Sequence, residues 1–599
     1  MNRKQLLPIV LSILFALPCT YGFGLFVPMT RSLLWVLLYG MSAFLGWHAL
    51  KKRPGKRANI AAAVLGFVFA CFTAAGTELE RDGRLAFYGL IVVQLIGFAL
   101  FLFFALKLLF SAVLESKLLS QEAGDLTGNE NLFSQPSSLK KTIVFAIVAA
   151  LLIFICWLPY FIIFWPGTMS SDALGEIRQQ LGLSPLTNHH PVIHQLFIKL
   201  CLVLAGNSVE KGTAVYSVFQ MILLSGAFGA ALAFIRNRTV TRWPVLLTFC
   251  FFAFFPVNPL YAIMMEKGSA MAPVTLILIL LLMKEMERPC PESSAGGTKG
   301  ETPEKNAAGL RRTLEMILLI VSSFLFCTLR NNGLYAFVIG MLFVMLLAVK
   351  WQRKRLLIVF TLSLIMVFGY RFILFDVVEV PKSSSGETLS VPLQQIARVA
   401  KECPEELNSE EFETFDEMFS DVTVLGDLYD PVCADPVKAP SIFSSEAFQN
   451  NKGKFLKSWL RLGLRHPREY LDAFLMQNYG YWYTDTDEAA VSYSIYEPND
   501  FGLSNNKHFE SARYKLMELL GRIMNSSPAA ILFSIGFSFW LLVLTMVILW
   551  LRGCGKYAVP LMIIAALWLT TLASPVYCSY RYLYPMVAVP NMFYLHKRS

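Results

Sequence analysis

The chain has 599 residues, of which 55% are hydrophobic and 14% aromatic, whereas only 16% are charged. About a quarter of the residues of soluble domains are charged, so this composition excludes a soluble globular protein and predicts an integral membrane protein. The formal net charge of +10 comes from short Lys and Arg clusters between apolar runs. That pattern sets orientation in a membrane and does not indicate a nucleic-acid partner.

The first 115 residues contain four apolar runs long enough to cross a bilayer, near 5–23, 32–50, 58–76 and 85–110. The first run begins like a signal peptide, but no cleavage site follows it, so we expect an uncleaved span. A Lys and Arg cluster between positions 51 and 57 places the loop after the second span, and therefore the N-terminus, in the cytoplasm. Residues 1–115 are thus predicted to form a four-helix membrane module.

A polar segment, 116–141, is expected to be a cytoplasmic linker, because it ends in two lysines. The fifth apolar run, 142–165, then brings the chain to the external side. The next run, 191–205, is expected to lie along the membrane surface, because a crossing there would place the arginines after the run 212–235 outside. The result is an external loop, 166–211, with two short helices.

The remaining predicted spans lie near 244–263, 269–286, 313–329, 333–349, 356–377, 529–551, 557–574 and 581–596. The total of about fourteen spans predicts an all-α polytopic protein of the plasma membrane with both termini in the cytoplasm. Residues 142–377 and 528–599 form its membrane core. Residues 378–527 are polar and acidic, and are predicted to form an external, mainly helical region. Cys403 and Cys433 pair there if the compartment is oxidising, and stay free otherwise.

The external loop gathers groups that can move protons at a membrane surface. Asp172, Glu176, His189 and His190 all stand in it. A carboxylate held outside a membrane helix beside imidazole and basic groups supports proton transfer; the alternative is that Asp172 only caps the helix that follows it. The same topology places further polar groups on the external side, namely Glu266, Lys267, Arg330, Asn331 and Arg581.

Five motifs occur in order along the chain, namely WPGTMSSD ending at Asp172, NHHP at 188–191, LRNNG at 329–333, VPLQQIAR at 391–398 and Tyr-Arg-Tyr at 580–582. With the two-helix external loop, they resemble the GT-C superfamily, membrane glycosyltransferases that use polyprenyl-phosphate-linked sugars. The resemblance is closest to a group of uncharacterised bacterial polytopic proteins of GT-C type. It does not explain residues 1–115, because GT-C enzymes usually place the catalytic loop after the first span.

The resemblance implies inverting transfer of a hexose or pentose to an acceptor hydroxyl on the extracytoplasmic face, with Asp172 as the base. Glu176 either orients Asp172 or the acceptor, or is a first-turn acid favoured by the helix dipole. His189 and His190 either contact the sugar or phosphate, or shape the turn before the proline at 191. The implied partners are a polyprenyl-phosphate sugar, membrane lipid, and a cell-envelope glycan, glycolipid or protein as acceptor.

The donor phosphate suits the planar guanidinium of Arg330 or Arg581 and the ammonium of Lys267. Each of these residues is alternatively an interfacial anchor. The remaining candidates are substrate-binding Asn331, Gln394, Gln395 and Trp482, and Asp485 with Asp487 for Mg²⁺ or Mn²⁺. For these groups the alternatives are a packed aromatic cluster around Trp482 and two loop carboxylates without a metal.

Two other functional classes remain open. A flippase or transporter of a lipid-linked glycan needs polar or charged groups at mid-bilayer, and most predicted spans lack them, with Gln220 among the exceptions. An O-antigen-type ligase or polymerase relies on His and Arg instead of a carboxylate base. A substitution of Asp172 therefore separates the ligase from the glycosyltransferase.

Overall fold

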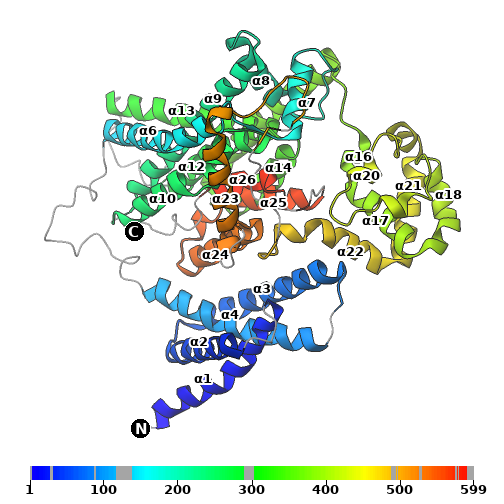
Figure 1. Ribbon diagram of the computed structural model, residues 1–599. Coiled ribbons are helices and arrows are strands. Elements are labelled where there is room, and N and C mark those ends of the chain that lie inside the picture. Colours follow the sequence, from blue (N-terminus) through cyan, green and yellow to red (C-terminus); the bar gives the residue numbers. More distant parts are fainter. Residues whose placement is uncertain are drawn as a thin grey trace.

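The computed structural model describes residues 3–26, 32–86, 89–115, 138–239, 241–288, 303–486, 494–495, 497–524, 529–573, 577 and 579–589. Within these residues the regular structure is helical, apart from one ladder of two short strands. Figure 1 shows the helices in three groups, which are a bundle near the N-terminus, a large central body and a lobe at its side. The predicted all-α class is confirmed.

Eight helices of the described chain are long and apolar enough to cross a membrane. They are α1 (Arg3–Gly22), α2 (Ser32–Lys51), α3 (Lys56–Asp82), α4 (Gly89–Glu115), α6 (Leu139–Ile163), α9 (Val209–Arg236), α12 (Lys267–Glu287) and α15 (Lys350–Phe372). Each corresponds to a predicted span. The chain is therefore an all-α membrane protein.

The other predicted spans correspond to different helices. These are α10 (Trp243–Phe254), α11 (Val257–Ala262), α13 (Pro303–Thr328), α14 (Gly333–Leu347), α24 (Ile535–Leu551), α25 (Met562–Ala573) and α26 (Tyr580–Ala588). Except for α13, they are shorter than the roughly 20 residues of a full crossing. The run 244–263 is not one helix, because Pro256 makes the preceding Phe255 extended and so separates α10 from α11. The count of fourteen spans stays a prediction.

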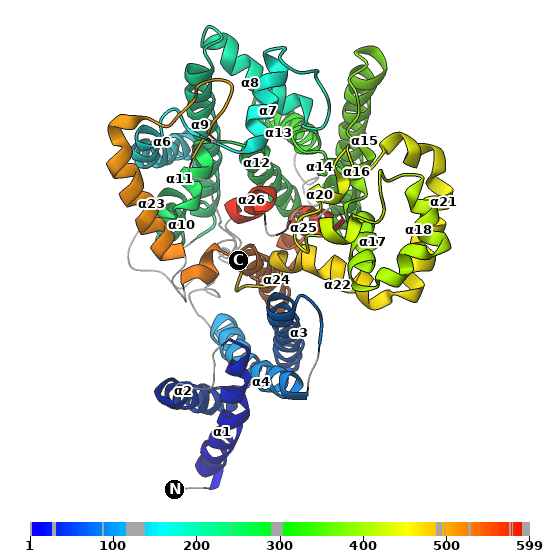
Figure 2. The same cartoon turned by 45° about the vertical axis from the view of Figure 1, so that its right-hand side comes forward.

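The helices α1 to α4 pack on one another and form a separate group in both views (Figures 1 and 2). They contact the rest of the chain through α3 and α4, which pack on α24, and through the end of α3. The hydroxyl groups of Thr77 and Tyr483 lie 3.2 Å apart, and the carbonyl of Gly83 accepts a hydrogen bond from Arg398 at 3.0 Å. The predicted N-terminal module thus contacts the polar region as well as the membrane core.

The polar region forms a lobe with its own hydrophobic core. Its helices are α16 (Ser385–Thr388), α17 (Ser390–Glu402), α18 (Glu410–Asp416), α19 (Leu425–Leu428), α20 (Asp435–Lys438), α21 (Ser445–Arg465) and α22 (Pro467–Asn478). Leu393 and Ile396 of α17 are fully buried at its centre. Cys403 and Cys433 are both free thiols, so the structure contains no pairing between them.

Residues 378–527 do not all belong to this lobe. The helix α23 (Glu510–Met524) packs on the membrane core through Leu516, Met517 and Leu520. The segment before it returns to the external loop, where Asn505 donates hydrogen bonds to the carbonyls of Phe164 and Gly167. The predicted single external region is therefore divided between the lobe and the central body.

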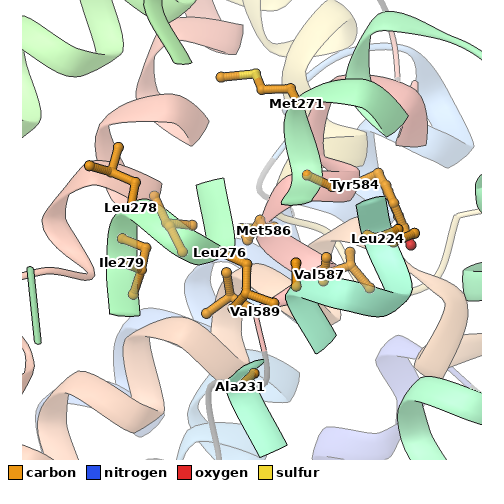
Figure 3. Close-up of a cluster of buried hydrophobic side chains, with 14 of the residues drawn as sticks. Leu224, Ala231, Met271, Leu276, Leu278, Ile279, Tyr584, Met586, Val587 and Val589 are labelled. Atoms are coloured by element: carbon orange, nitrogen blue, oxygen red, sulfur yellow. The ribbon is translucent and has the colours of Figure 1, made fainter. Parts of the chain in front are cut away.

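The central body is built around α9, α12 and α26. Figure 3 shows Leu224 of α9, Met271 and Leu276 of α12, and Tyr584 and Met586 of α26 gathered in one cluster. All five side chains are fully buried. Fixing α26 against α12 in this way brings the C-terminal part of the chain to residues far earlier in the sequence.

The loop 166–211, which is predicted to be external, contains two helices, α7 (Ser171–Gln180) and α8 (Val192–Leu204), as its sequence predicts. Both are too short to cross a bilayer. The strand β1 (Thr168–Met169) precedes α7 and pairs in parallel with β2 (Met264–Met265), which precedes α12. This ladder fixes the start of α7 beside the start of α12.

Candidate functional site

The site begins where the two strands end. Since β1 and β2 are parallel, with Met169 opposite Met265, the residues that follow them emerge at the same edge. Ser170 and Asp172 follow β1, and Glu266 and Lys267 follow β2. The Ser170 hydroxyl donates a hydrogen bond of 2.8 Å to Glu266, which joins the two turns directly.

Asp172 contacts two cations that come from distant parts of the sequence. Its Oδ2 lies 2.9 Å from Nζ of Lys267 and 3.4 Å from Nη1 of Arg581. The Asp172 side chain is 23% exposed, so one edge of the carboxylate remains open to a small molecule. The structure thus brings together one predicted base and two predicted phosphate-binding residues.

The charge state of Asp172 follows from this environment. Burial alone would raise the pKa of the carboxyl, but the positive charges of Lys267 and Arg581 outweigh it and hold the pKa well below its usual value. Asp172 is consequently ionised at neutral pH. While both cations stay beside it, it is also a weak proton acceptor.

His190 also contacts Lys267, whose other partner is Asp172. Its Nδ1 lies 3.0 Å from Nζ of Lys267 and 3.9 Å from Oε1 of Glu176. Burial, followed by the positive charge of Lys267, lowers the pKa of His190 to about 4. The imidazole is therefore neutral at pH 7, and Nδ1 can accept a hydrogen bond from the lysine. His189, its neighbour, is exposed.

Glu176 does not lie open to a substrate. Its side chain is 1% exposed and is hydrogen-bonded to Nδ1 of His194. His194 in turn bonds through Nε2 to the hydroxyl of Tyr216 at 2.8 Å. These two hydrogen bonds connect α7 to α8 and α9. Glu176 therefore holds α7 in position. Because this carboxylate is buried and already bonded, it is not placed to contact an acceptor; the predicted role of orienting Asp172 stays a prediction.

Glu266 is a member of the site for which no role is predicted from the sequence. It is 2% exposed, and its Oε2 lies 3.9 Å from Nη1 of Arg581. Its other oxygen is buried without a hydrogen-bond partner among the described residues. The external position of Glu266 was the only signal in the sequence, because a two-residue strand leaves no readable pattern before it.

Arg330 supports the site from one side. Its Nη1 donates a hydrogen bond of 3.0 Å to the carbonyl of Arg581, and its guanidinium stacks 4.2 Å from the ring centroid of Tyr582. Gly268 makes this approach possible, because a Cβ there would lie 1.9 Å from the same carbonyl. Asn331 bonds to the carbonyls of Asn188 and His189, which holds the histidine turn against α13.

The other predicted substrate residues lie elsewhere. Gln394 and Gln395 are buried in the lobe, where their amides donate to the carbonyls of Asp430 and Tyr470. Trp482 is 5% exposed and packs edge to face with Phe72 of α3. Because these side chains already have partners inside the protein, the structure does not bring them to Asp172 as predicted.

The predicted cation site is only partly described. Asp485 is exposed, and Asp487 lies outside the described residues. Within the described residues, no group of three or more His, Cys, Asp or Glu side chains is arranged to hold a metal ion. The Asp485–Asp487 pair therefore stays a prediction.

Comparison with known proteins gives a family. Residues 182–598 match the family described as "Family of unknown function (DUF6020)". The chain belongs to the DUF6020 family. The match includes Lys267, Arg330 and Arg581 but begins after Asp172 and Glu176, so the DUF6020 part supplies the cations of the site and the preceding loop supplies its exposed carboxylate. No curated protein and no solved structure matches the chain.

Proposed function

We propose that this protein is a membrane glycosyltransferase that takes a sugar from a polyprenyl-phosphate donor on the extracytoplasmic face. The observation that carries the proposal is the contact of Asp172 with both Lys267 and Arg581. A carboxylate beside two fixed cations is the minimum needed to accept a proton and to hold a leaving phosphate. The motif resemblance to GT-C enzymes supplies the reaction class.

The donor phosphate activates the base. When the phosphate draws Lys267 and Arg581 toward itself, Asp172 loses the charges that depress its pKa, and it becomes a stronger proton acceptor. The acceptor hydroxyl then gives its proton to Asp172 while its oxygen bonds to the anomeric carbon. The bond from that carbon to the phosphate oxygen breaks, and the lipid phosphate leaves with its charge held by the two cations.

An apolar groove offers a place for the lipid chain of the donor. It has a volume of about 340 Å³ and is lined by residues of α6 and α9, including Phe161, Val218 and Phe219. Trp165, also in its wall, precedes β1 by three residues. The groove therefore lies at the same end of these helices as Asp172, where a prenyl chain from the outer leaflet would arrive.

The test compares wild type with Asp172→Asn in membranes supplied with polyprenyl-phosphate sugars, and it measures release of the sugar from the lipid. We expect Asp172→Asn to slow transfer about 100-fold or more, the range for loss of a general base, while donor binding persists. The matched control is Asp500→Asn, which removes a carboxylate from an exposed ion pair with Arg178 of α7 and should leave transfer unchanged.

Undiminished transfer by Asp172→Asn would remove this carboxylate from the chemistry. A ligase that relies on His and Arg would then be the better explanation. Movement of intact donor across the membrane without release of sugar would instead favour a flippase. Gln220 is one of the polar groups in a predicted span that a transporter could use. Its amide instead donates hydrogen bonds to the carbonyls of Tyr261, Ala262 and Met264.

A further inference from the structure

A large cavity lies at the opposite end of α12 from Asp172. It has a volume of about 1490 Å³, and it is lined by α6, α9, α12, α13, α15 and the turn after α24. Lys284 of α12 lines it, and seventeen residues of helix place this lysine roughly 25 Å from Lys267. The cavity is therefore a separate site. Its volume exceeds the roughly 300–1,000 Å³ of common small-molecule pockets.

The cavity carries a surplus of positive charge. Eight Lys or Arg side chains line it, against two carboxylates, Glu287 and Glu315. Glu287 pairs with Arg238, and Glu315 is shared by Lys284, Arg288 and Arg311. Glu285, which does not line the cavity, pairs with Arg288 and Arg355. The protein's own carboxylates thus leave several cations of the cavity without compensation.

Three lining cations are available to a ligand. Arg312 and Lys354 are exposed and have no ion-pair partner within the described part of the chain. Arg288 is ion-paired with Glu285 and Glu315, but its Nη1 is buried and has no hydrogen-bond partner among the described residues. A buried guanidinium nitrogen without a partner has lost its contact with water and gained no hydrogen bond in exchange. An anion with several oxygens would satisfy these groups together.

The remaining wall is aliphatic and opens toward the membrane. Ile143 of α6 and Leu318 of α13 both line the cavity, and they are 49% and 52% exposed. On helices this apolar, such side chains face lipid. Ala230 of α9 also lines the cavity. The cavity therefore has a polar end for a headgroup and a lateral opening for an acyl chain.

We infer that this cavity binds an anionic phospholipid, with the phosphate held by Arg312, Lys354 and Arg288 and an acyl chain against the wall at Ala230. The preference for Lys and Arg in cytoplasmic loops accounts for the sign of the charge. It does not account for a cavity that combines unpaired cations with an open aliphatic side. Inorganic phosphate has no apolar part that could contact the aliphatic side. The site does not depend on the function proposed for Asp172.

The experiment measures thermal unfolding of the full-length protein in detergent during titration with dioleoyl phosphatidic acid. A ligand that binds only the folded state raises the unfolding temperature. Dioleoyl phosphatidylcholine and inorganic phosphate are titrated in parallel. We expect phosphatidic acid to act at about tenfold lower concentration than phosphatidylcholine, and inorganic phosphate to give no shift.

Two pairs of variants locate the site. Arg312→Gln with Lys354→Gln should raise the required phosphatidic acid concentration about tenfold, whereas Lys452→Gln with Lys457→Gln, two exposed lysines of α21, should not. Ala230→Phe keeps every cation but fills the wall, and it should also weaken the response. Leu223→Phe, an exposed position on the same helix outside the cavity, is its control.

Equal losses in the two charge pairs would show general attraction of the headgroup to the protein surface, and would overturn the inference. So would a full response of Ala230→Phe, or a shift caused by inorganic phosphate alone. Each shift is compared with that of the same variant without lipid, so a change in basal stability does not affect the outcome.

Discussion

At the scale of single residues, the candidate site places two cations around one partly exposed carboxylate. Lys267 and Arg581 contact Asp172, and Arg581 also lies 3.9 Å from Glu266. Arg330 bonds to the carbonyl of Arg581 and not to a carboxylate. Cations placed beside the accessible carboxylate favour an anionic substrate over a neutral one.

His190 makes the stability of this site depend on pH. Its pKa lies near 4 in the folded protein and near 6.5 in the unfolded chain. Between these values the unfolded chain binds a proton that the folded protein does not, so the free energy of unfolding falls as the pH falls. From pH 6.5 to 4.5 the loss due to His190 should be about 2–3 kcal/mol.

Thermal unfolding between pH 7 and 4.5 measures this loss. In His190→Gln the unfolding temperature should fall less steeply with acid than in wild type. The matched control is His189→Gln, since His189 is the exposed neighbour of His190, and it should keep the wild-type slope. A His190→Gln variant with an unchanged slope would assign the acid sensitivity to other groups.

At the scale of the elements, the sequence predicts which ends of helices meet but not how they are joined. Hydropathy and charge place Asp172, Lys267 and Arg581 on one side of the membrane, and the structure brings them into contact. The β1–β2 ladder that sets this contact is two residues long, too short for an alternating pattern. The ladder places Glu266 in the site, and because the ladder is not readable in the sequence, no role for Glu266 could be predicted.

In the lobe, residues that are predicted to bind substrate lie away from the site. Gln394 and Gln395 stand in the motif VPLQQIAR and are predicted from the sequence to bind the substrate. They belong to α17, whose residues from 393 to 400 are all buried, and their amides bond within the lobe. From a single sequence, a polar side chain that binds a ligand cannot be distinguished from one that forms hydrogen bonds inside a hydrophobic core.

The close contact of α12 with α26 gives a prediction for one glycine. In Gly268→Ala the new methyl group would meet the carbonyl of Arg581, so α26 must shift away and carry Arg581 from Asp172. Overpacking of this kind costs about 1–3 kcal/mol. We expect a lower unfolding temperature and, in the sugar-release assay, weaker donor binding.

Gly226→Ala is the control for this change. A Cβ at Gly226 of α9 has no neighbour within 4 Å, and alanine favours a helix interior over glycine by about 0.5–1 kcal/mol. Its unfolding temperature should therefore stay level or rise. Equal behaviour of the two glycine variants would contradict the close contact between α12 and α26.

At the scale of the whole molecule, the structure sorts the ends of the core helices into two sets. The start of α12 and the turn between α13 and α14 contribute Lys267 and Arg330 to the site. The end of α12 and the start of α13 contribute Lys284 and Arg311 to the basic cavity. This is the sorting that the positive-inside rule predicts from the sequence. Which set faces the cytoplasm is a prediction from charge alone.

Cysteine labelling in intact cells tests this orientation. Asp500→Cys lies in the segment that covers the external loop, and Lys354→Cys lies at the basic cavity; both positions are exposed in the wild-type protein. We expect a membrane-impermeant maleimide to label the first in intact cells and the second only after permeabilisation, above the background of the parent protein. The reverse result would place Asp172 in the cytoplasm. A donor in the outer leaflet would then have no access to Asp172, and the basic cavity would face the external leaflet instead. The glycosyltransferase proposal would lose the membrane side on which its donor is assumed to arrive, whereas lipid binding measured in detergent would not be affected.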